Sequence, residues 1–348
     1  MENNEKNYAI EFFRFLFITI IAIHHLQPRF NIQYIASGYL GVEFFFILSG
    51  FFLANKFERK RMKSGIEYTK SRLKKLYPSY LLALSVIFIL TVTSAIIEKN
   101  ISITESIFRL FSEIFLMQNT GIFLSGLNAP LWYFSVLIIA GYFIYEFLIR
   151  DKEKFIKILA PITILLVYTV LSNYGTVENW QKNFCFYMPL LRGTADMLIG
   201  VLLFYLYIKY KNRIKETINK YKIICSLGEI VTYLLIVYLI IFKTSYEIYS
   251  ILLFSILILL ANTENSVTYK FFNKKMFEKL GNLSYPIYLN HAAIIMLMNV
   301  VFNHIIKLDN KLIIVIIFLM ALIIYSIVTK YIINRIQNRK INIIKKKY

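Results

Sequence analysis

A series of long apolar segments recurs along the whole chain and restricts its fold more than any other feature. A helix needs about 20 apolar residues to cross the hydrocarbon core of a bilayer. Ten segments meet or approach this length, at 9–27, 39–55, 77–97, 130–149, 155–172, 190–208, 222–242, 246–262, 280–305 and 311–333. The sequence therefore predicts an all-α, polytopic membrane protein of about ten transmembrane helices.

The overall composition agrees with this interpretation. Hydrophobic residues make up 58% of the chain, and the mean hydropathy is +0.58. No stretch between the apolar segments is long and polar enough to form a separate soluble domain. We therefore expect residues 1–348 to form a single transmembrane domain.

The distribution of basic residues predicts which side of the membrane each segment faces. With the N-terminus placed inside, 31 of the 40 Lys and Arg residues fall on the inner side and seven on the outer side. Since Lys and Arg accumulate in cytoplasmic loops, both termini are predicted to be cytoplasmic. The two most basic inner segments are a loop at 56–76 and a tail at 334–348.

The net charge of +20 has a membrane explanation. A soluble protein with this charge would suggest nucleic-acid binding, but here the basic residues follow the topology and face anionic lipid. The expected partner of this surface is the lipid bilayer and not nucleic acid, and an anionic cytoplasmic ligand for part of it stays open. No feature of the sequence specifies an oligomeric state or a metal site.

The first apolar segment contains two charged or titratable residues on one helical face. A charge in hydrocarbon costs about 2.5–3.5 kcal/mol, so each one requires a partner or a purpose. Arg14 and His25 are 11 residues apart, about three helical turns, so they share a face about 16 Å apart along the axis. Two simpler interpretations stay open: Arg14 extends to the inner interface, and His25 bonds a backbone carbonyl near the outer one.

Other charged residues lie inside later segments. Glu43 lies about one turn into the second segment, at a depth similar to His25. A carboxylate bonded to one imidazole nitrogen fixes the tautomer and raises the basicity of the other. The sequence permits such a contact between Glu43 and His25 but does not show it. Arg192 and Asp196 are spaced i, i+4, and they either serve a ligand or neutralise each other.

Together these positions resemble the acyltransferase-3 family of bacterial membrane O-acyltransferases. Arg14 and His25 match the family's Arg-x10-His signature, and Gly41–Phe51 matches its Gly-Val-Asp segment with Glu43 for the commoner Asp. The other matching motifs are the basic run before Tyr77-Pro78, Leu131-Trp132, Arg192 to Gly200 with Asp196 at a usually apolar position, and Ser284-Tyr285 to His291. The resemblance covers nearly the whole chain.

The resemblance implies a reaction and its participants. The family transfers acyl groups, commonly acetyl, from cytoplasmic acyl-CoA to sugar hydroxyls of cell-surface polysaccharides or their lipid-linked glycan precursors. We therefore expect acetyl-CoA or another acyl-CoA as co-substrate, no permanently bound cofactor, and a place in the bacterial cytoplasmic membrane. Some members carry an SGNH-type hydrolase domain, whereas this sequence ends soon after its last apolar segment, which predicts a standalone protein.

The resemblance also implies roles for individual residues. His25 is expected to act as general base, oriented by Glu43. The donor would be held by positively charged residues, which are Arg14, Arg192, Arg72 and Lys75. The pocket and the acceptor site would include Ser49, Trp132, Ser284, Tyr288 and His291. Trp132 at an outer mouth suits either sugar stacking or an interfacial belt, and Pro286 is expected to allow a kink.

A different class of function also fits the sequence. A flippase or exporter of a glycan or lipid intermediate would have many helices and buried charges without acyl transfer. The sequence lacks the paired broken segments that are typical of many transporters. Consumption of acyl-CoA by the purified protein distinguishes the two classes.

Overall fold

The computed structural model describes residues 6–59, 62–98, 102–118, 120, 126–174, 176–178, 182–183, 186–304, 306 and 308–347. The longer helices are α1 (Tyr8–Phe30), α2 (Gly41–Arg59), α3 (Gly65–Glu98), α5 (Trp132–Lys154), α7 (Met188–Lys220), α8 (Lys222–Ile241), α12 (Ser284–His304) and α13 (Lys311–Lys347). The shorter ones are α4 (Ile103–Ile114), α6 (Ala160–Ser172), α9 (Tyr249–Ala261), α10 (Val267–Phe272) and α11 (Met276–Gly281). Two strands of two residues each, β1 (Lys182–Asn183) and β2 (Phe186–Tyr187), form a hairpin before α7.

The prediction of an all-α, polytopic membrane protein is confirmed. Within the described residues, eight helical segments are long and apolar enough to cross a membrane. One of them, Ala129–Ser172, contains two of the ten predicted segments, and α9 is a shorter apolar helix that matches a third. All ten predicted segments thus fall on helices.

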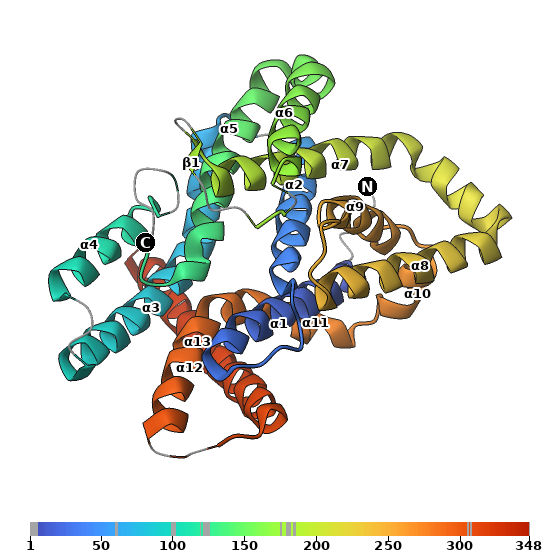
Figure 1. The fold of residues 1–348 in the computed structure, drawn as a ribbon. Coiled ribbons are helices and arrows are strands. Elements are labelled where there is room, and N and C mark those ends of the chain that lie inside the picture. Colours follow the sequence, from blue (N-terminus) through green and yellow to red (C-terminus); the bar gives the residue numbers. More distant parts are fainter. Residues whose placement is uncertain are drawn as a thin grey trace.

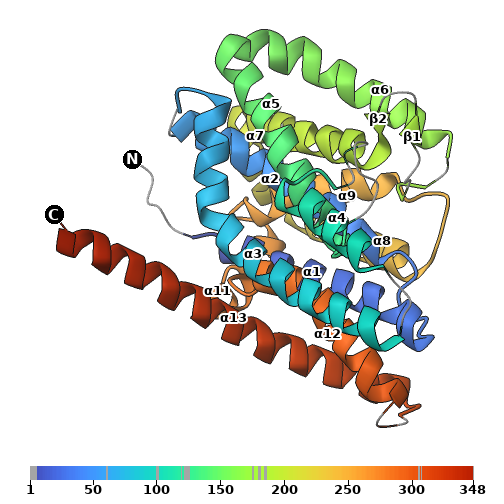
Figure 2. The same ribbon diagram turned by 90° about the vertical axis from the view of Figure 1, so that its left-hand side faces the viewer.

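The helices run in both directions through the molecule (Figure 1). Figure 2 shows that α1 begins and α13 ends towards the same side, with α13 projecting beyond the other helices. This arrangement agrees with two termini on one side, and the cytoplasmic identity of that side stays a prediction. Residues 60, 61 and 348 of the two predicted basic segments lie outside the described residues.

Two glycines bring α2 and α7 into close contact. A Cβ atom at Gly50 would overlap the carbonyl oxygen of Met197, and one at Gly200 would overlap that of Ile47. Small residues at such crossings let helix backbones approach closely, which is how helices associate in the membrane. The crossing fixes the side chains of α2 against those of α7.

The structure corrects two predicted boundaries on the inner side. The segment predicted as a basic loop at 56–76 is mostly helical, because α2 continues to Arg59 and α3 begins at Gly65. Figure 2 shows a bend in α3, and the helix contains Pro78, which lacks an N–H to donate. The first part of α3 thereby holds its basic residues against the rest of the bundle.

The predicted segment 280–305 is divided in the structure. The helix α11 ends at Gly281 and α12 begins at Ser284, so Pro286 lies in the first turn of α12. Proline is tolerated there because the first N–H groups of a helix have no intrahelical acceptor. The predicted helix is thus interrupted at Asn282 and Leu283, just ahead of Pro286, and not kinked within a continuous helix.

Candidate active site

A cavity of about 770 Å³ lies between α1, α2, α3, α12, α13 and the start of α5. Its volume falls within the range of small-molecule binding sites. One face of α1 lines it with residues at helical spacing, which are Glu11, Arg14, Ile18, Ile21 and His25. The prediction that Arg14 and His25 face a shared path is therefore confirmed.

One end of the cavity, which contains Arg14, is strongly basic. Six positively charged residues line it, which are Lys6, Arg14, Lys56, Arg72, Lys75 and Lys330. Among the described residues that line the cavity, Glu11 is the one carboxylate. Three of the four predicted donor-binding residues, Arg14, Arg72 and Lys75, thus lie together, and this end of the cavity suits an anion with several charges.

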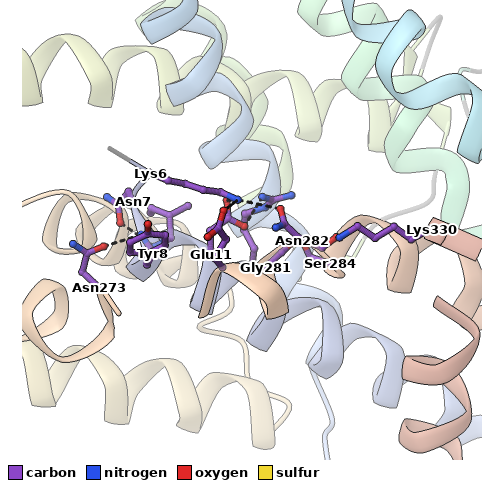
Figure 3. A network of polar contacts seen from close by, with 12 residues as sticks. Lys6, Asn7, Tyr8, Glu11, Asn273, Gly281, Asn282, Ser284 and Lys330 are labelled. Carbon is purple, nitrogen blue, oxygen red and sulfur yellow. Dashed lines mark hydrogen bonds and ion pairs between the residues drawn. The ribbon is translucent and has the colours of Figure 1, made fainter. Parts of the chain in front are cut away.

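Figure 3 shows how polar contacts hold one wall of this basic end. Arg14 Nη1 lies 2.9 Å from Glu11 Oε2, and Lys6 Nζ lies 3.7 Å from Glu11 Oε1. Glu11 packs against Gly281, where a Cβ atom would overlap its carboxylate. Because Glu11 fixes the Arg14 side chain, the guanidinium is held in place before any ligand binds.

At the other end of the cavity, His25 stacks on His291. The ring centroids are 5.3 Å apart, and the rings are inclined by 25°. His291 is fully buried, and its Nδ1 lies 2.8 Å from the carbonyl oxygen of Tyr288, which requires an N–H at Nδ1. His291 was predicted to line the pocket, but in the structure it stacks on the ring of His25 and does not itself line the cavity.

The predicted contact between Glu43 and His25 is wrong. Glu43 is completely buried, and its Oε1 lies 3.3 Å from Nε of Arg192 in the closely packed α7. The stripe of α2 that faces the cavity contains Val42, Phe45 and Ser49, and Glu43 points about 100° away from Val42. Glu43 therefore pairs with Arg192 on a face of α2 that differs from the face lining the cavity.

Arg192 was predicted to bind the donor, and the structure contradicts this role. It is 2% exposed and does not line the cavity. Its guanidinium lies over the ring of Trp132 at 5.2 Å and donates to the carbonyl oxygen of Val177. Asp196 accepts a hydrogen bond from Tyr168 and lies against Glu43, so the i, i+4 pairing with Arg192 gives way to a network across helices.

The remaining predicted pocket residues do line the cavity, and three of them form hydrogen bonds that the sequence did not predict. Ser49 Oγ lies 3.0 Å from the hydroxyl oxygen of Tyr133, a second cavity residue. Ser284 donates to the carbonyl oxygen of Gly281, and Tyr288 donates to that of Pro130. Trp132 touches the cavity, but it is 6% exposed and lies in the interior, so its predicted place at an outer mouth is wrong.

A buried polar cluster of Glu113 and Asn128 lies beside the cavity residue Leu289. The backbone N–H of Asn128 donates to Glu113 Oε1 at 3.0 Å, and Asn128 Nδ2 lies 3.4 Å from the carbonyl oxygen of Leu289. Burial raises the pKa of Glu113 to about 8. Within the described residues, no side chain of the loops 31–37, 242–248 or 308–310 lines the cavity.

Comparison with known proteins agrees with this site. The profile of the acyltransferase-3 family, described as an acyltransferase domain, matches residues 7–333. The chain belongs to this family. Its eight long apolar helical segments within the described residues agree with a multi-pass membrane member of this family, as the resemblance of its motifs indicated.

Individual proteins with a similar sequence agree with the family assignment. The chain is 25% identical over 311 residues to the O-acetyltransferase OatA of Staphylococcus aureus strain NCTC 8325 / PS 47, and equally to that of strain COL. The match covers 80% of this chain and 49% of each relative, so the chain spans about half the length of these relatives. No solved structure matches the chain.

Several cavity residues were missed by the sequence analysis. Lys6 and Lys330 lie at or beyond the ends of the predicted segments, where basic residues were assigned to the membrane surface. Tyr133 follows Trp132 directly and was not distinguished from the surrounding aromatic residues. The i, i+4 spacing of Lys330 and Asn334 on the last helix was a signal that could have found this wall.

Proposed function

We propose that the protein is an O-acyltransferase that moves an acetyl group from cytoplasmic acetyl-CoA to a hydroxyl of a cell-surface glycan or its lipid-linked precursor. The observation that carries the proposal is one cavity with a basic end and an imidazole end, both on one face of α1. Family membership and the similarity to OatA favour acetyl transfer over transport. The bacterial cytoplasmic membrane, with both termini inside, is part of the proposal.

The donor would enter from the basic end. The phosphates of CoA carry several negative charges, and Arg14, Arg72 and Lys75 offer charge-assisted hydrogen bonds to them. The pantetheine arm is slender, and it would extend along the face of α1 past Ile18 and Ile21. This places the thioester near His25, about 16 Å along the helix axis from Arg14.

The chemical step would use His25 as general base. Its imidazole accepts the proton of the acceptor hydroxyl while the hydroxyl oxygen attacks the thioester carbonyl carbon. The carbon–sulfur bond breaks, and the CoA thiolate takes the proton from the imidazolium, which leaves an ester, free CoA and neutral His25. Ser49, paired with Tyr133, is the proposed hydroxyl donor for the developing oxyanion.

His291 would act as a positioning residue in this scheme. The Nδ1–H to Tyr288 fixes its ring, and the stack between the two imidazoles orients His25 towards the cavity. The sequence analysis assigned this orienting role to Glu43, which instead pairs with Arg192. The acceptor would reach His25 from the side covered by Pro130 and Tyr288.

The test is acetyl-CoA consumption by the purified protein in the presence of an acceptor glycan, followed by release of free thiol. His25→Gln should lower kcat by about 10²–10⁴ while CoA binding persists, because it removes the base and not the basic end. Arg14→Gln should raise KM for acetyl-CoA. His24→Gln is the matched control, since His24 is the adjacent imidazole and does not line the cavity. Undiminished turnover by His25→Gln, or glycan movement without acetyl-CoA consumption, would refute the proposal.

A further inference from the structure

Two lysines from opposite ends of the chain meet at one residue of the cavity wall. Lys6 Nζ donates to Asn282 Oδ1 at 3.0 Å, and Lys330 Nζ lies 3.3 Å from the backbone carbonyl oxygen of the same residue (Figure 3). Lys6 precedes α1, Lys330 is in α13, and Asn282 joins α11 to α12. All three residues line the cavity at its basic end.

The charges at this wall are only partly neutralised. Lys6 has two carboxylate partners, Glu11 at 3.7 Å and Glu278 at 3.5 Å, and Glu11 is shared with Arg14. Among the described residues, no carboxylate lies within ion-pair distance of Lys330. Lys6 and Lys330 repel each other, so an anion between them would be stabilised by both.

Lys6 and Lys330 belong to other segments of the chain than the predicted donor-binding residues of α3. Arg72 and Lys75 belong to α3, whereas Lys330 belongs to a stripe of α13 that also contributes Asn334 and Gln337 to the cavity. An ammonium is a compact point charge with rotatable donors, which suits a terminal phosphomonoester, whereas the planar guanidinium suits bidentate contacts. The basic end thus combines Arg72 and Lys75 of α3 with a second group of cations, Lys6 and Lys330, which come from the two ends of the chain.

We propose that Lys6 and Lys330 form a site for the terminal phosphomonoester of the donor, which in CoA is the 3′-phosphate. The inference rests on the proposed function and deepens it by naming the part of the donor that this wall recognises. The α13 wall would then distinguish CoA from carriers that lack this phosphate.

The test compares two ligands that differ in this phosphate alone. Binding of CoA and of dephospho-CoA to the purified full chain is measured by calorimetry at two salt concentrations. We expect the wild-type protein to bind CoA about tenfold more tightly, as one charge-assisted contact would give. Lys330→Gln and Lys6→Gln should reduce this ratio to near one, and Lys330→Arg should keep most of it.

Arg335→Gln is the matched control, because Arg335 lies on the same helix, is exposed and does not line the cavity. It should keep the wild-type ratio. The ratio is measured within each variant, so a moderate loss of stability does not alter it. Equal affinities of the wild-type protein for the two ligands, or an unchanged ratio in Lys330→Gln, would overturn this inference and leave the proposed function intact. No CoA binding at all would overturn both.

An anionic lipid headgroup presents the same phosphomonoester chemistry. The titrations are therefore repeated in bilayer discs of phosphatidylcholine alone and with added phosphatidic acid. A CoA to dephospho-CoA ratio that is the same in both lipids supports the donor as the ligand. A ratio that falls to near one when phosphatidic acid is added would assign the pair to the lipid headgroup and overturn the inference.

Discussion

The ion pair between Glu43 and Arg192 provides the sharpest test of how the structure divides charges between folding and function. The two side chains are 0% and 3% exposed, and Nε of Arg192 lies 3.3 Å from Glu43 Oε1. Removal of one partner from such a pair leaves an uncompensated buried charge, which typically lowers the free energy of unfolding by about 3–5 kcal/mol. We expect Arg192→Met to show a loss of this size.

The same substitution should leave donor binding unchanged. Arg192 does not line the cavity, and its other contacts are the ring of Trp132 and the carbonyl oxygen of Val177. CoA affinity of Arg192→Met should therefore stay within about twofold of wild type at a temperature where the variant is folded. Arg14→Met should behave in the opposite way, with weaker CoA binding and a smaller loss of stability, because Arg14 lines the cavity and its side chain is 30% exposed.

The assay combines equilibrium unfolding in mixed micelles with CoA calorimetry. Both are measured on the single variants Glu43→Gln and Arg192→Met and on the double variant that carries both substitutions. Because the partners are in contact, the double variant should lose less stability than the two single losses added together, by about 0.5–3 kcal/mol. Wild-type stability together with a tenfold weaker CoA affinity in Arg192→Met would refute this reasoning and return Arg192 to the donor site.

Three further outcomes follow from single positions. Gly50→Ala should lower the free energy of unfolding by about 1–3 kcal/mol because its Cβ would overlap the Met197 carbonyl, whereas Gly228→Ala, with no atom within 4 Å, should be neutral or stabilising in the same assay. Folded Glu113 holds its proton up to about pH 8 while the unfolded carboxyl loses it near pH 4.5, so stability should fall as pH rises between these values; Glu113→Gln should flatten that profile in unfolding measured across pH. Lys75→Gln should raise KM for acetyl-CoA and weaken its dependence on salt, measured by turnover at two ionic strengths.

Local periodicity explains why part of the site was predictable from the sequence. Arg14 and His25 share a face because of helix geometry alone, which holds wherever the residues between them are helical. The apolar segments likewise predicted the eight membrane-length helical segments of the described residues, because hydrocarbon thickness sets their length. These features depend on residues close together in the sequence.

The features that the sequence did not predict depend on contacts between distant segments. Glu43 and Arg192 meet because Gly50 lets α2 approach α7, and no pattern within either helix specifies that partner. The contact between His25 and His291 likewise depends on the way α1 packs on α12. Charged residues were correctly expected to need partners, but the choice of partner was a property of the packed bundle.

The placement of the base and a donor-binding cation on one helix has a physical consequence for the proposed reaction. Both groups move together with α1, so the distance between them is set by the helix and not by the looser packing between helices. A thioester carried on an arm of fixed length requires such a fixed distance, since misplacement by about 1 Å can lower a rate about 10²-fold. The second wall, made by α3 and α13, then needs only to hold the charged end of the donor, a task that tolerates movement because charge attraction falls off slowly with distance.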